Sequence, residues 1–159
     1  MAKPSVSKFY NLFVIGVGFL GQVEDFKEPD VKSMKADTPM GYKVDIGIPE
    51  ALEAEVTLQS INSVLYDAVA KMDEAKFQIK EQVIEDGKTH TIVHTMIGSF
   101  DNEFDTTKLK ETKKAKLKLY PQRYTKEIDG KEVVFVDMAA PIFRLNGKDI
   151  LEKTRAAIN

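Results

Sequence analysis

The sequence of 159 residues contains no cysteine, which excludes disulfides, thiolate metal ligands and a cysteine nucleophile. It also has no apolar run of about 18 residues, the length that a membrane-spanning helix needs. Neither charge is in large excess, because 25 acidic and 23 basic residues give a formal net charge of −2. Domains that bind nucleic acid in general are usually strongly basic, so this balance argues against that class. We expect a single domain, synthesised in the cytoplasm because the N-terminus does not resemble a signal peptide.

The motifs that carry common enzyme chemistry are missing as well. There is no Gly-x-Ser-x-Gly nucleophile elbow and no phosphate-binding loop ending in Gly-Lys-Ser or Gly-Lys-Thr. Gly16, Gly18 and Gly21 form Gly-x-Gly-x-x-Gly, but no helix is expected after them to hold a pyrophosphate, so we interpret them as turn residues. His90 and His94 are expected on one strand roughly 13 Å apart, too far to share a metal. The sequence therefore predicts no enzyme, no cofactor and no metal site, and a function based on shape and association.

What the sequence does contain is a series of β-hairpin signals. Asp129-Gly130 separates two strand-like segments, and Asn146-Gly147 ends a third; both dipeptides favour turns with positive φ. Another hairpin is expected around residues 85–88. Residues 51–58 alternate between an apolar face and a face that carries Glu53 and Glu55, which predicts a half-buried strand with an acidic outer side.

Helical periodicity is confined to two segments. In residues 60–72 a capping Ser60 precedes an apolar stripe, which predicts one helix that covers an open sheet face. The stripe consists of Ile61, Val64, Leu65, Ala68, Val69 and Met72. Residues 148–158 carry a weaker stripe at the same spacing, so we expect a short helix at the C-terminus.

Residues 38–49 combine two prolines and two glycines with many apolar side chains. The prolines and glycines predict an irregular loop, yet an irregular solvated loop rarely carries so many apolar residues. Either the loop folds back on its own domain or it is buried in another subunit, and composition alone leaves both open.

Lys114, Lys116 and Lys118 alternate with apolar residues, which predicts a strand with a charged outer face that discourages edge pairing. The acidic segment 99–105 lies just before them, and adjacent segments of opposite charge suit a contact between copies of one protein. A second interpretation is a small β-barrel nucleic-acid-binding module that uses the lysine strand. Residues 106–119 contain no aromatic side chain for base stacking, which argues against that alternative.

Taken in order, the segments resemble the major tail tube protein of contractile-tailed bacteriophages and of related phage-tail-like bacteriocins. Three stretches carry the likeness. They are residues 11–23, residues 40–52 with Val44-Asp45-Ile46-Gly47, and residues 128–151 with the Asp129-Gly130 and Asn146-Gly147 turns and the basic helix after them.

The resemblance implies a mainly β fold with one flanking α-helix and a short C-terminal helix, in which two antiparallel sheets pack as a barrel-like sandwich. It implies one domain over residues 1–159, with an inter-subunit loop around 37–50. It also implies hexameric rings that stack into the rigid inner tube of a contractile tail, assembled in the host cytoplasm as the conduit for DNA delivery. Expected partners are further copies, the tail sheath protein, the tape-measure and baseplate tube proteins, and DNA that passes without specific binding, with no membrane anchor. The alternative is the tube of a phage-tail-like bacteriocin or of a contractile secretion system.

The resemblance also gives expectations for individual surfaces. We expect the loop to lie between subunits or rings through Met40, Gly41, Tyr42, Lys43, Val44, Ile46 and Ile48. A wall that passes DNA should be neutral or acidic, so Glu53 and Glu55 are expected to face the lumen. Lys114, Lys116 and Lys118 should then point elsewhere, toward the sheath or toward the acids of a neighbour.

Overall fold

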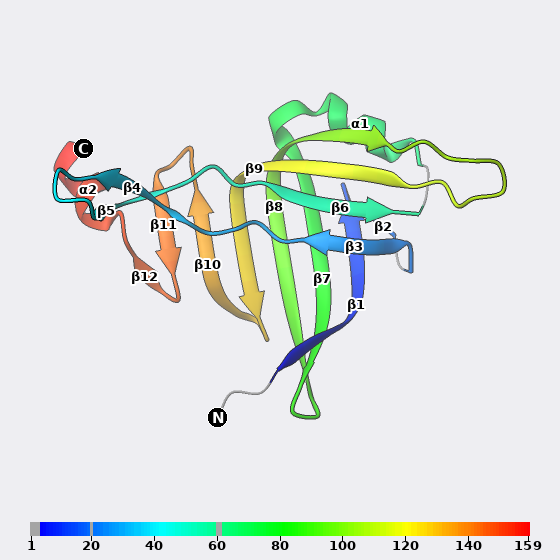
Figure 1. Ribbon diagram of the computed structural model, residues 1–159, viewed down its shortest axis with the longest axis horizontal. Helices are drawn as coiled ribbons and strands as arrows, with labels where there is room; N and C mark the ends of the chain where they lie inside the picture. Colours follow the sequence, from blue (N-terminus) through cyan, green and yellow to red (C-terminus); the bar gives the residue numbers. More distant parts are fainter. Residues whose placement is uncertain (1–3, 20, 60–61) are drawn as a thin grey trace.

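The computed structural model describes residues 4–19, 21–59 and 62–159, and in these residues the chain is mainly β with two helices (Figure 1). Ten strands belong to one large sheet, and β4 and β5 form a separate two-stranded sheet. The expected fold class is confirmed. The elements in order are β1 Ser5–Val14, β2 Val17–Gly18, β3 Val23–Lys27, β4 Ser33–Asp37, β5 Lys43–Pro49, β6 Ala54–Leu58, α1 Val64–Ala70, a 3-10 turn Met72–Glu74, β7 Ala75–Glu85, β8 Lys88–Phe104, β9 Ala115–Ile128, β10 Lys131–Asp137, β11 Ile142–Leu145, β12 Lys148–Asp149 and α2 Glu152–Ile158.

The large sheet is antiparallel and forks at β9. Its main path runs β12-β11-β10-β9-β8-β7-β1-β2, while β6 pairs with β9 and β3 pairs with β6. The first half of β9 has β6 as its neighbour and the second half has β10, with β8 along the other side throughout. The arm with β3 and β6 crosses the arm with β1 and β7, as Figure 1 shows. The two arms form the two layers of a sandwich, and the sheet of the single chain is not a closed barrel.

The two long strands β8 and β9 bend where the layers separate. The register shifts between Ile97 and Gly98, because Ile97 pairs with Arg123 while Gly98 pairs with Pro121. A Cβ added to Gly98 would lie 2.3 Å from the carbonyl oxygen of Tyr120, so only glycine allows the two backbones to approach this closely. The bulge and the glycine together make the corner of the fold.

The hydrophobic core lies between the two arms. Alternate residues of every long strand point into it and are buried, because successive side chains of a strand face opposite sides. They include Leu12, Val14, Val56, Leu58, Phe77, Ile79, Met96, Phe100, Leu117 and Leu119. The predicted apolar face of residues 51–58 is confirmed, since Leu52, Ala54, Val56 and Leu58 are all buried.

The turns that the sequence predicts are confirmed by their backbone angles. Asp129 and Gly130 have φ of 51° and 80°, and Asn146 and Gly147 have φ of 49° and 83°. The same pair of positive angles occurs at residues 86–87, between β7 and β8, and at residues 15–16, between β1 and β2. Gly16 is therefore a turn residue, as expected.

The helix α1 is shorter than the predicted stripe. It begins at Val64 and buries Leu65 and Ala68 in the core. Val69 is 40% exposed and Met72 is 72% exposed, so the prediction that these two residues cover the sheet is wrong. Met72 has φ of 56° in the 3-10 turn, because the chain reverses there to enter β7. Ser60 and Ile61, the predicted cap and first apolar residue, lie outside the described residues.

Residues 38–49 are not an irregular loop, and that prediction is wrong. β5 pairs with β4 in an antiparallel hairpin that lies near α2 at one end of the molecule (Figure 1). Thr38 closes the turn, since its hydroxyl donates to the carbonyl oxygen of Tyr42 at 2.7 Å. Pro39 lies in the turn and Pro49 ends the strand, where a missing N–H is tolerated. Gly47, with φ of 72°, lies within the register shift.

Candidate assembly surfaces

The β4–β5 hairpin exposes a group of large apolar side chains. They are Met34, Met40, Tyr42, Val44, Ile46 and Ile48, and Met40 at the tip is 84% exposed. The hairpin packs on the segment before α2, because a Cβ added to Gly47 would lie 3.2 Å from Cγ2 of Ile150. Exposed apolar groups of this kind usually mark a contact with another molecule. The residues expected between subunits are thus exposed in the single chain.

Polar contacts within the hairpin fix its shape. Lys35 forms an ion pair with Asp45 at 3.2 Å, and Asp45 Oδ1 accepts a hydrogen bond from the N–H of Gly47 at 2.9 Å. The hydrogen bond from Gly47, followed by that from Lys35, lowers the pKa of Asp45. Asp45 is therefore charged at neutral pH and links the two strands on either side of the register shift.

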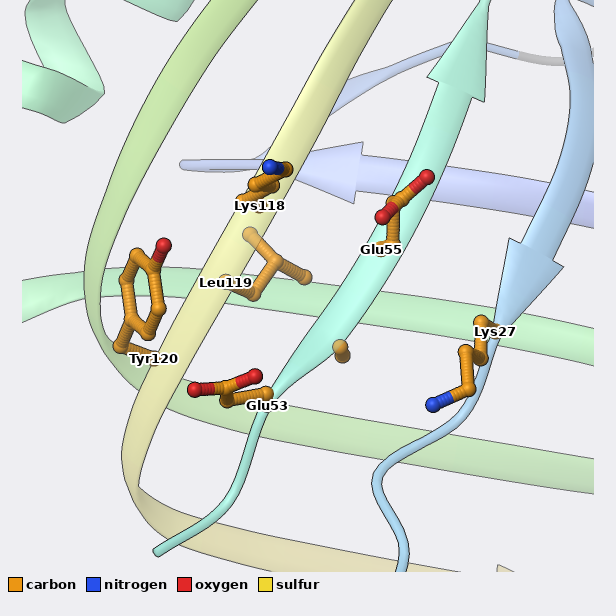
Figure 2. A pocket seen from close by; sticks show the side chains of 7 residues that line it. Lys27, Glu53, Glu55, Lys118, Leu119 and Tyr120 are labelled. Atoms are coloured by element: carbon orange, nitrogen blue, oxygen red, sulfur yellow. The ribbon is translucent and has the colours of Figure 1, made fainter.

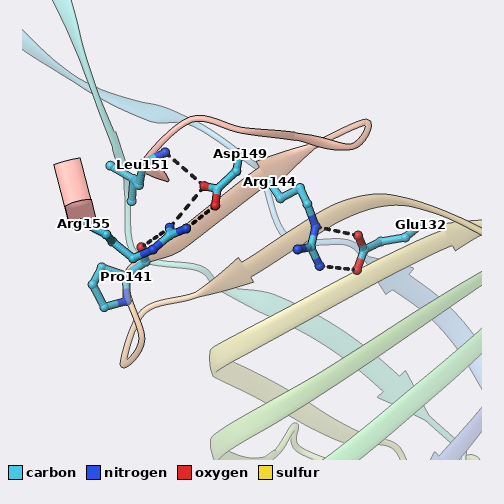
Figure 3. A network of polar contacts seen from close by, with 6 residues as sticks. All are labelled: Glu132, Pro141, Arg144, Asp149, Leu151 and Arg155. Atoms are coloured by element: carbon cyan, nitrogen blue, oxygen red, sulfur yellow. Dashed lines mark hydrogen bonds and ion pairs between the residues drawn. The ribbon is translucent and has the colours of Figure 1, made fainter. Parts of the chain in front are cut away.

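The end of the molecule on which the hairpin packs is held by arginine–carboxylate contacts (Figure 3). Asp149 accepts hydrogen bonds from the Arg155 guanidinium and, at 3.1 Å, from the N–H of Leu151. Arg155 also donates to the carbonyl oxygen of Pro141 at 3.0 Å, which ties α2 to the turn before β11. The Arg155 contact lowers the pKa of Asp149. A second arginine makes a bidentate pair nearby, Arg144 with Glu132 at 2.8 and 3.1 Å.

The arm with β3 and β6 forms a four-stranded layer with the first half of β9 and the end of β8. We call its solvent side the charged face, because the side chains that alternate with its buried residues are mostly ionic. They are Asp25, Lys27, Glu53, Glu55, Asp101, Glu103, Lys116 and Lys118. Figure 2 shows Glu53, Glu55, Lys118 and Tyr120 around a shallow hollow of this face, with Lys27 at its side.

Lysines and acids of the charged face neutralise one another. Lys116 pairs with Glu55 at 3.3 Å and Lys118 pairs with Glu103 at 3.4 Å. Beside the face, Lys114 pairs with Glu24 at 2.9 Å. The hydrogen bonds to Glu24 and to Glu55 raise the pKa of Lys114 and of Lys116, respectively. The lysines are thus charged and largely occupied by carboxylates.

The expectation that the lysines point away from the side of Glu53 and Glu55 is wrong for Lys116 and Lys118, while Lys114 lies beside that face and pairs with Glu24. β6 pairs with β9, and Glu55 lies opposite Lys118 in that pairing. Side chains at paired positions share a face of the sheet, so acids and lysines lie together. Nothing in the sequence shows which strands become neighbours, and no local signal could have found this arrangement.

The four-stranded layer has an unpaired edge on each side. β3 pairs only with β6 in the described part of the chain. β7 accompanies β8 as far as Gly98, and from Ser99 to Phe104 the only strand partner of β8 among the described residues is β9, although α1 and the 3-10 turn also contact β8. An unpaired edge is a template for pairing with another chain.

The other unpaired edges of the large sheet are short or interrupted. β2 and β12 have two residues each. Among the described residues β1 has no outer strand partner from Ser5 to Leu12, but a register shift between Ser7 and Phe9 places Lys8 in a bulge there. Short strands, bulges and lysines all discourage pairing. The two edges of the four-stranded layer therefore remain as the candidates for continuing the sheet into another copy.

A buried polar cluster lies between the layers, and the sequence did not indicate it. His94 is completely buried; its Nδ1 lies 2.8 Å from the Tyr124 hydroxyl and its Nε2 lies 3.3 Å from Glu81 Oε2. Phe26 of β3 packs edge-on against the imidazole. The contact with His94 lowers the pKa of Glu81, while burial raises the pKa of Tyr124 well above its usual value. Every polar atom of His94 is used in joining strands, so the cluster has a structural role.

The described residues contain no group of three His, Asp or Glu side chains that could hold a metal ion. Within those residues neither helix has the length and apolar character needed to cross a membrane. A comparison with protein-family models matches residues 5–158 to the model described as phage tail tube protein FII. No curated protein matches the chain. The match spans both layers, the hairpin and α2.

Proposed function

Because the chain belongs to the phage tail tube protein FII family, whose members are structural components of the virion tail, we propose a specific place for it in the tail. It is the subunit of hexameric rings that stack into the inner tube of a contractile tail, through which DNA reaches the host. One observation carries this proposal: the four-stranded layer has two unpaired edges and a charged outer face.

The layer has the geometry that a shared barrel needs. Its four strands are antiparallel in the order β3-β6-β9-β8, so β8 of one copy would meet β3 of the next in the antiparallel sense. Six copies with four strands each would give about 24 strands. Barrels of roughly 16–18 strands already enclose an aqueous channel, so this barrel would be wide enough for one. Closure would also remove both unpaired edges.

The same layer decides which side faces the channel. Its apolar side packs on the second layer of the same chain, so the second layer would lie outside the barrel and the charged face would line the lumen. That face carries five acids, Asp25, Glu53, Glu55, Asp101 and Glu103, and three lysines, Lys27, Lys116 and Lys118. A wall with an acidic excess, and with two of its lysines paired to acids, would hold phosphates weakly and let DNA move. We therefore place Lys116 and Lys118 in the lumen with their partners and not against the sheath.

The β4–β5 hairpin supplies the second contact. Its exposed apolar side chains would be buried against a neighbouring copy in the same ring or the next ring. A contact between unlike surfaces of identical chains is heterologous, and such contacts generate rings and stacks. Sheath, tape-measure and baseplate tube proteins would then meet the outer layer or the ends of the stack, with assembly in the host cytoplasm.

The proposal is tested by oligomerisation of the purified chain. Light scattering coupled to gel filtration and negative-stain microscopy should show rings or tubes at high concentration. Val44→Asp in the hairpin should raise the concentration needed for assembly about tenfold or more, because interface anchors contribute more than about 1 kcal/mol each. Val6→Asp is the matched control, since Val6 is also exposed but lies on β1, away from the proposed contacts. A wild-type chain that stays strictly monomeric at every concentration would contradict the proposal.

A further inference from the structure

The charges at the two unpaired edges indicate how neighbouring copies join. We propose that Lys27 of one copy forms an ion pair with the acidic edge of the next copy, made of Asp101 and Glu103, and that this contact selects which edges pair and in which direction they are staggered. The inference rests on the proposed function, because it names the residues at the junction of the shared sheet.

Charges alternate along one row of the charged face. Lys27 on β3 lies opposite Glu55 on β6, Glu55 lies opposite Lys118 on β9, and Lys118 lies opposite Asp101 on β8. The row therefore reads plus, minus, plus, minus from one unpaired edge to the other. Opposite charges at paired positions stabilise a sheet and like charges destabilise it. A junction between copies continues this alternation only if Lys27 meets an acid of the adjacent β8.

Both ends of the row lack a strong partner within the chain. Asp101 makes no ion pair with any described residue. The only ion pair of Lys27 in that part of the chain is with Asp30 at 3.6 Å, and these side chains are 70% and 59% exposed. Exposed pairs of this kind contribute little to stability. Lys27 at one edge and Asp101 at the other are thus available to a second copy, while Glu103 shares the exposed Lys118 at 3.4 Å.

The junction has one cation and several acids. Lys27 is the only basic residue of β3, while Asp25 shares its face. Beyond the end of β7, the solvent side of β8 carries Asp101 and Glu103 and no base. Two β8 edges would bring acids together, which disfavours that pairing. Pairing of β3 with β8 is the combination in which Lys27 compensates acids from both chains.

The barrel geometry fixes the direction of the stagger. Strands in a closed barrel are tilted and therefore shifted in register from one to the next. Without a shift at the junction, Lys27 lies opposite Asp101 and continues the row, but antiparallel pairing then places Asp25 opposite Glu103, two like charges. A two-residue shift toward the start of β8 would place Lys27 opposite the uncharged Ser99, and a larger shift is blocked because β7 occupies that edge as far as Gly98. The remaining direction moves Lys27 toward Glu103, so an acid faces it in either register.

Charge exchange tests the ion pair in the full-length chain. Lys27→Glu should raise the concentration needed for ring or tube formation about tenfold or more, since the junction then contains only acids. Asp101→Lys combined with Glu103→Lys should weaken assembly in the same way, and all three changes together should restore it to within about threefold of wild type. Lys88→Glu, at the β7–β8 turn, makes the same charge change elsewhere and should have no effect. Thermal melting of each variant monitors the fold.

Crosslinking provides a second readout that does not depend on charge. The chain has no cysteine, so Lys27→Cys together with Glu103→Cys introduces the only two thiols. Mild oxidation of the assembled variant should give a covalent ladder that ends at the closed ring, and each single-cysteine variant should give dimers at most. Wild-type rings combined with unaffected assembly of Lys27→Glu and no ladder would overturn the inference alone. Failure of the wild-type chain to form any oligomer would overturn the proposed function and the inference with it.

Discussion

At the scale of single residues, the buried His94 links three strands of one layer, β7, β8 and β9, and Phe26 of the other layer packs against its ring. Tyr124 keeps its proton at neutral pH because burial raises its pKa, so its hydroxyl can donate to Nδ1 of His94. Glu81 keeps its charge because its pKa is lowered, so Nε2 of His94 donates to it. Both imidazole nitrogens of the completely buried His94 thus have a hydrogen-bond partner, as buried polar groups require.

This assignment gives a prediction for Tyr124. Tyr124→Phe removes the hydroxyl and leaves the buried Nδ1 of His94 without a partner, which should lower the free energy of unfolding by about 1–3 kcal/mol. Urea denaturation followed by circular dichroism measures the change. Tyr120→Phe makes the same chemical change on the same strand at an exposed side chain and should have almost no effect. Equal losses in the two variants would show that the hydroxyl of Tyr124 is not a special contact.

The residue scale also shows the limit of sequence reasoning. The turn residues could be predicted, because Asp129-Gly130 and Asn146-Gly147 carry their own conformational preference. The burial of His94 could not, because its partners Glu81 and Tyr124 are distant in sequence. The ion pair between Glu55 and Lys116 could not be predicted for the same reason, since the two residues are distant in sequence. The sequence therefore wrongly places the acids and the lysines on different faces.

At the scale of elements, the corner in β8 and β9 determines how the two layers are related. β8 and β9 each belong to one layer at one end and to the other layer at the far end. Both strands pass between the layers at the register shift at Gly98, and no loop is needed there. Bulges bend strands and increase their twist, and a glycine in a strand often marks a close approach of two backbones. Because β8 turns into the other layer at this corner, it continues past the end of β7, and its last residues form the unpaired edge.

A side chain at the corner should therefore be poorly tolerated. Gly98→Ala places its Cβ where the carbonyl oxygen of Tyr120 lies, and backbone atoms cannot move away as a flexible side chain would. We expect a loss of about 3 kcal/mol or more in the free energy of unfolding, at the upper end of the range for overpacked sites. Thermal and urea denaturation measure it, with Ser99→Ala as the adjacent control. A loss below about 1 kcal/mol would contradict a rigid corner.

Elements differed in how well the sequence predicted them. The strict alternation over residues 51–58 correctly predicts a strand, although β6 spans only Ala54–Leu58. The helix was predicted too long, because Val69 and Met72 fit the period but the reversal into β7 ends the helix at Ala70. The β4–β5 hairpin differs from the prediction, because Pro39 and Pro49 indicate an irregular loop. Both lie at positions where a strand pair needs no N–H.

At the scale of the whole molecule, the chain has two layers with different surroundings. One layer has unpaired edges and a charged face, and the other has short or interrupted edges. The unpaired edges of β3 and of the end of β8 do not stabilise a monomer, whereas in a ring both edges would pair with neighbouring copies. The family could be recognised from the order of the segments, but the layer that forms the wall could not, since strand order is set by contacts between distant segments.

The proposed lumen wall gives a prediction for the assembled tube. Glu53→Gln combined with Glu55→Gln removes two of the five acids and releases Lys116 from its ion pair, so three acids and three lysines remain and the wall loses the acidic excess that repels phosphates. Tubes of this variant should bind short duplex DNA about tenfold more tightly at low salt, with a steeper loss of binding as salt rises, since each phosphate contact adds about 0.9 to the slope. Filter binding over a salt series measures both quantities. Glu85→Gln combined with Glu127→Gln makes the same change in net charge on β7 and on the second half of β9, in the other layer, and these tubes should bind DNA as weakly as wild type. If the two double variants behaved alike, the charged face would not be the surface along which DNA moves.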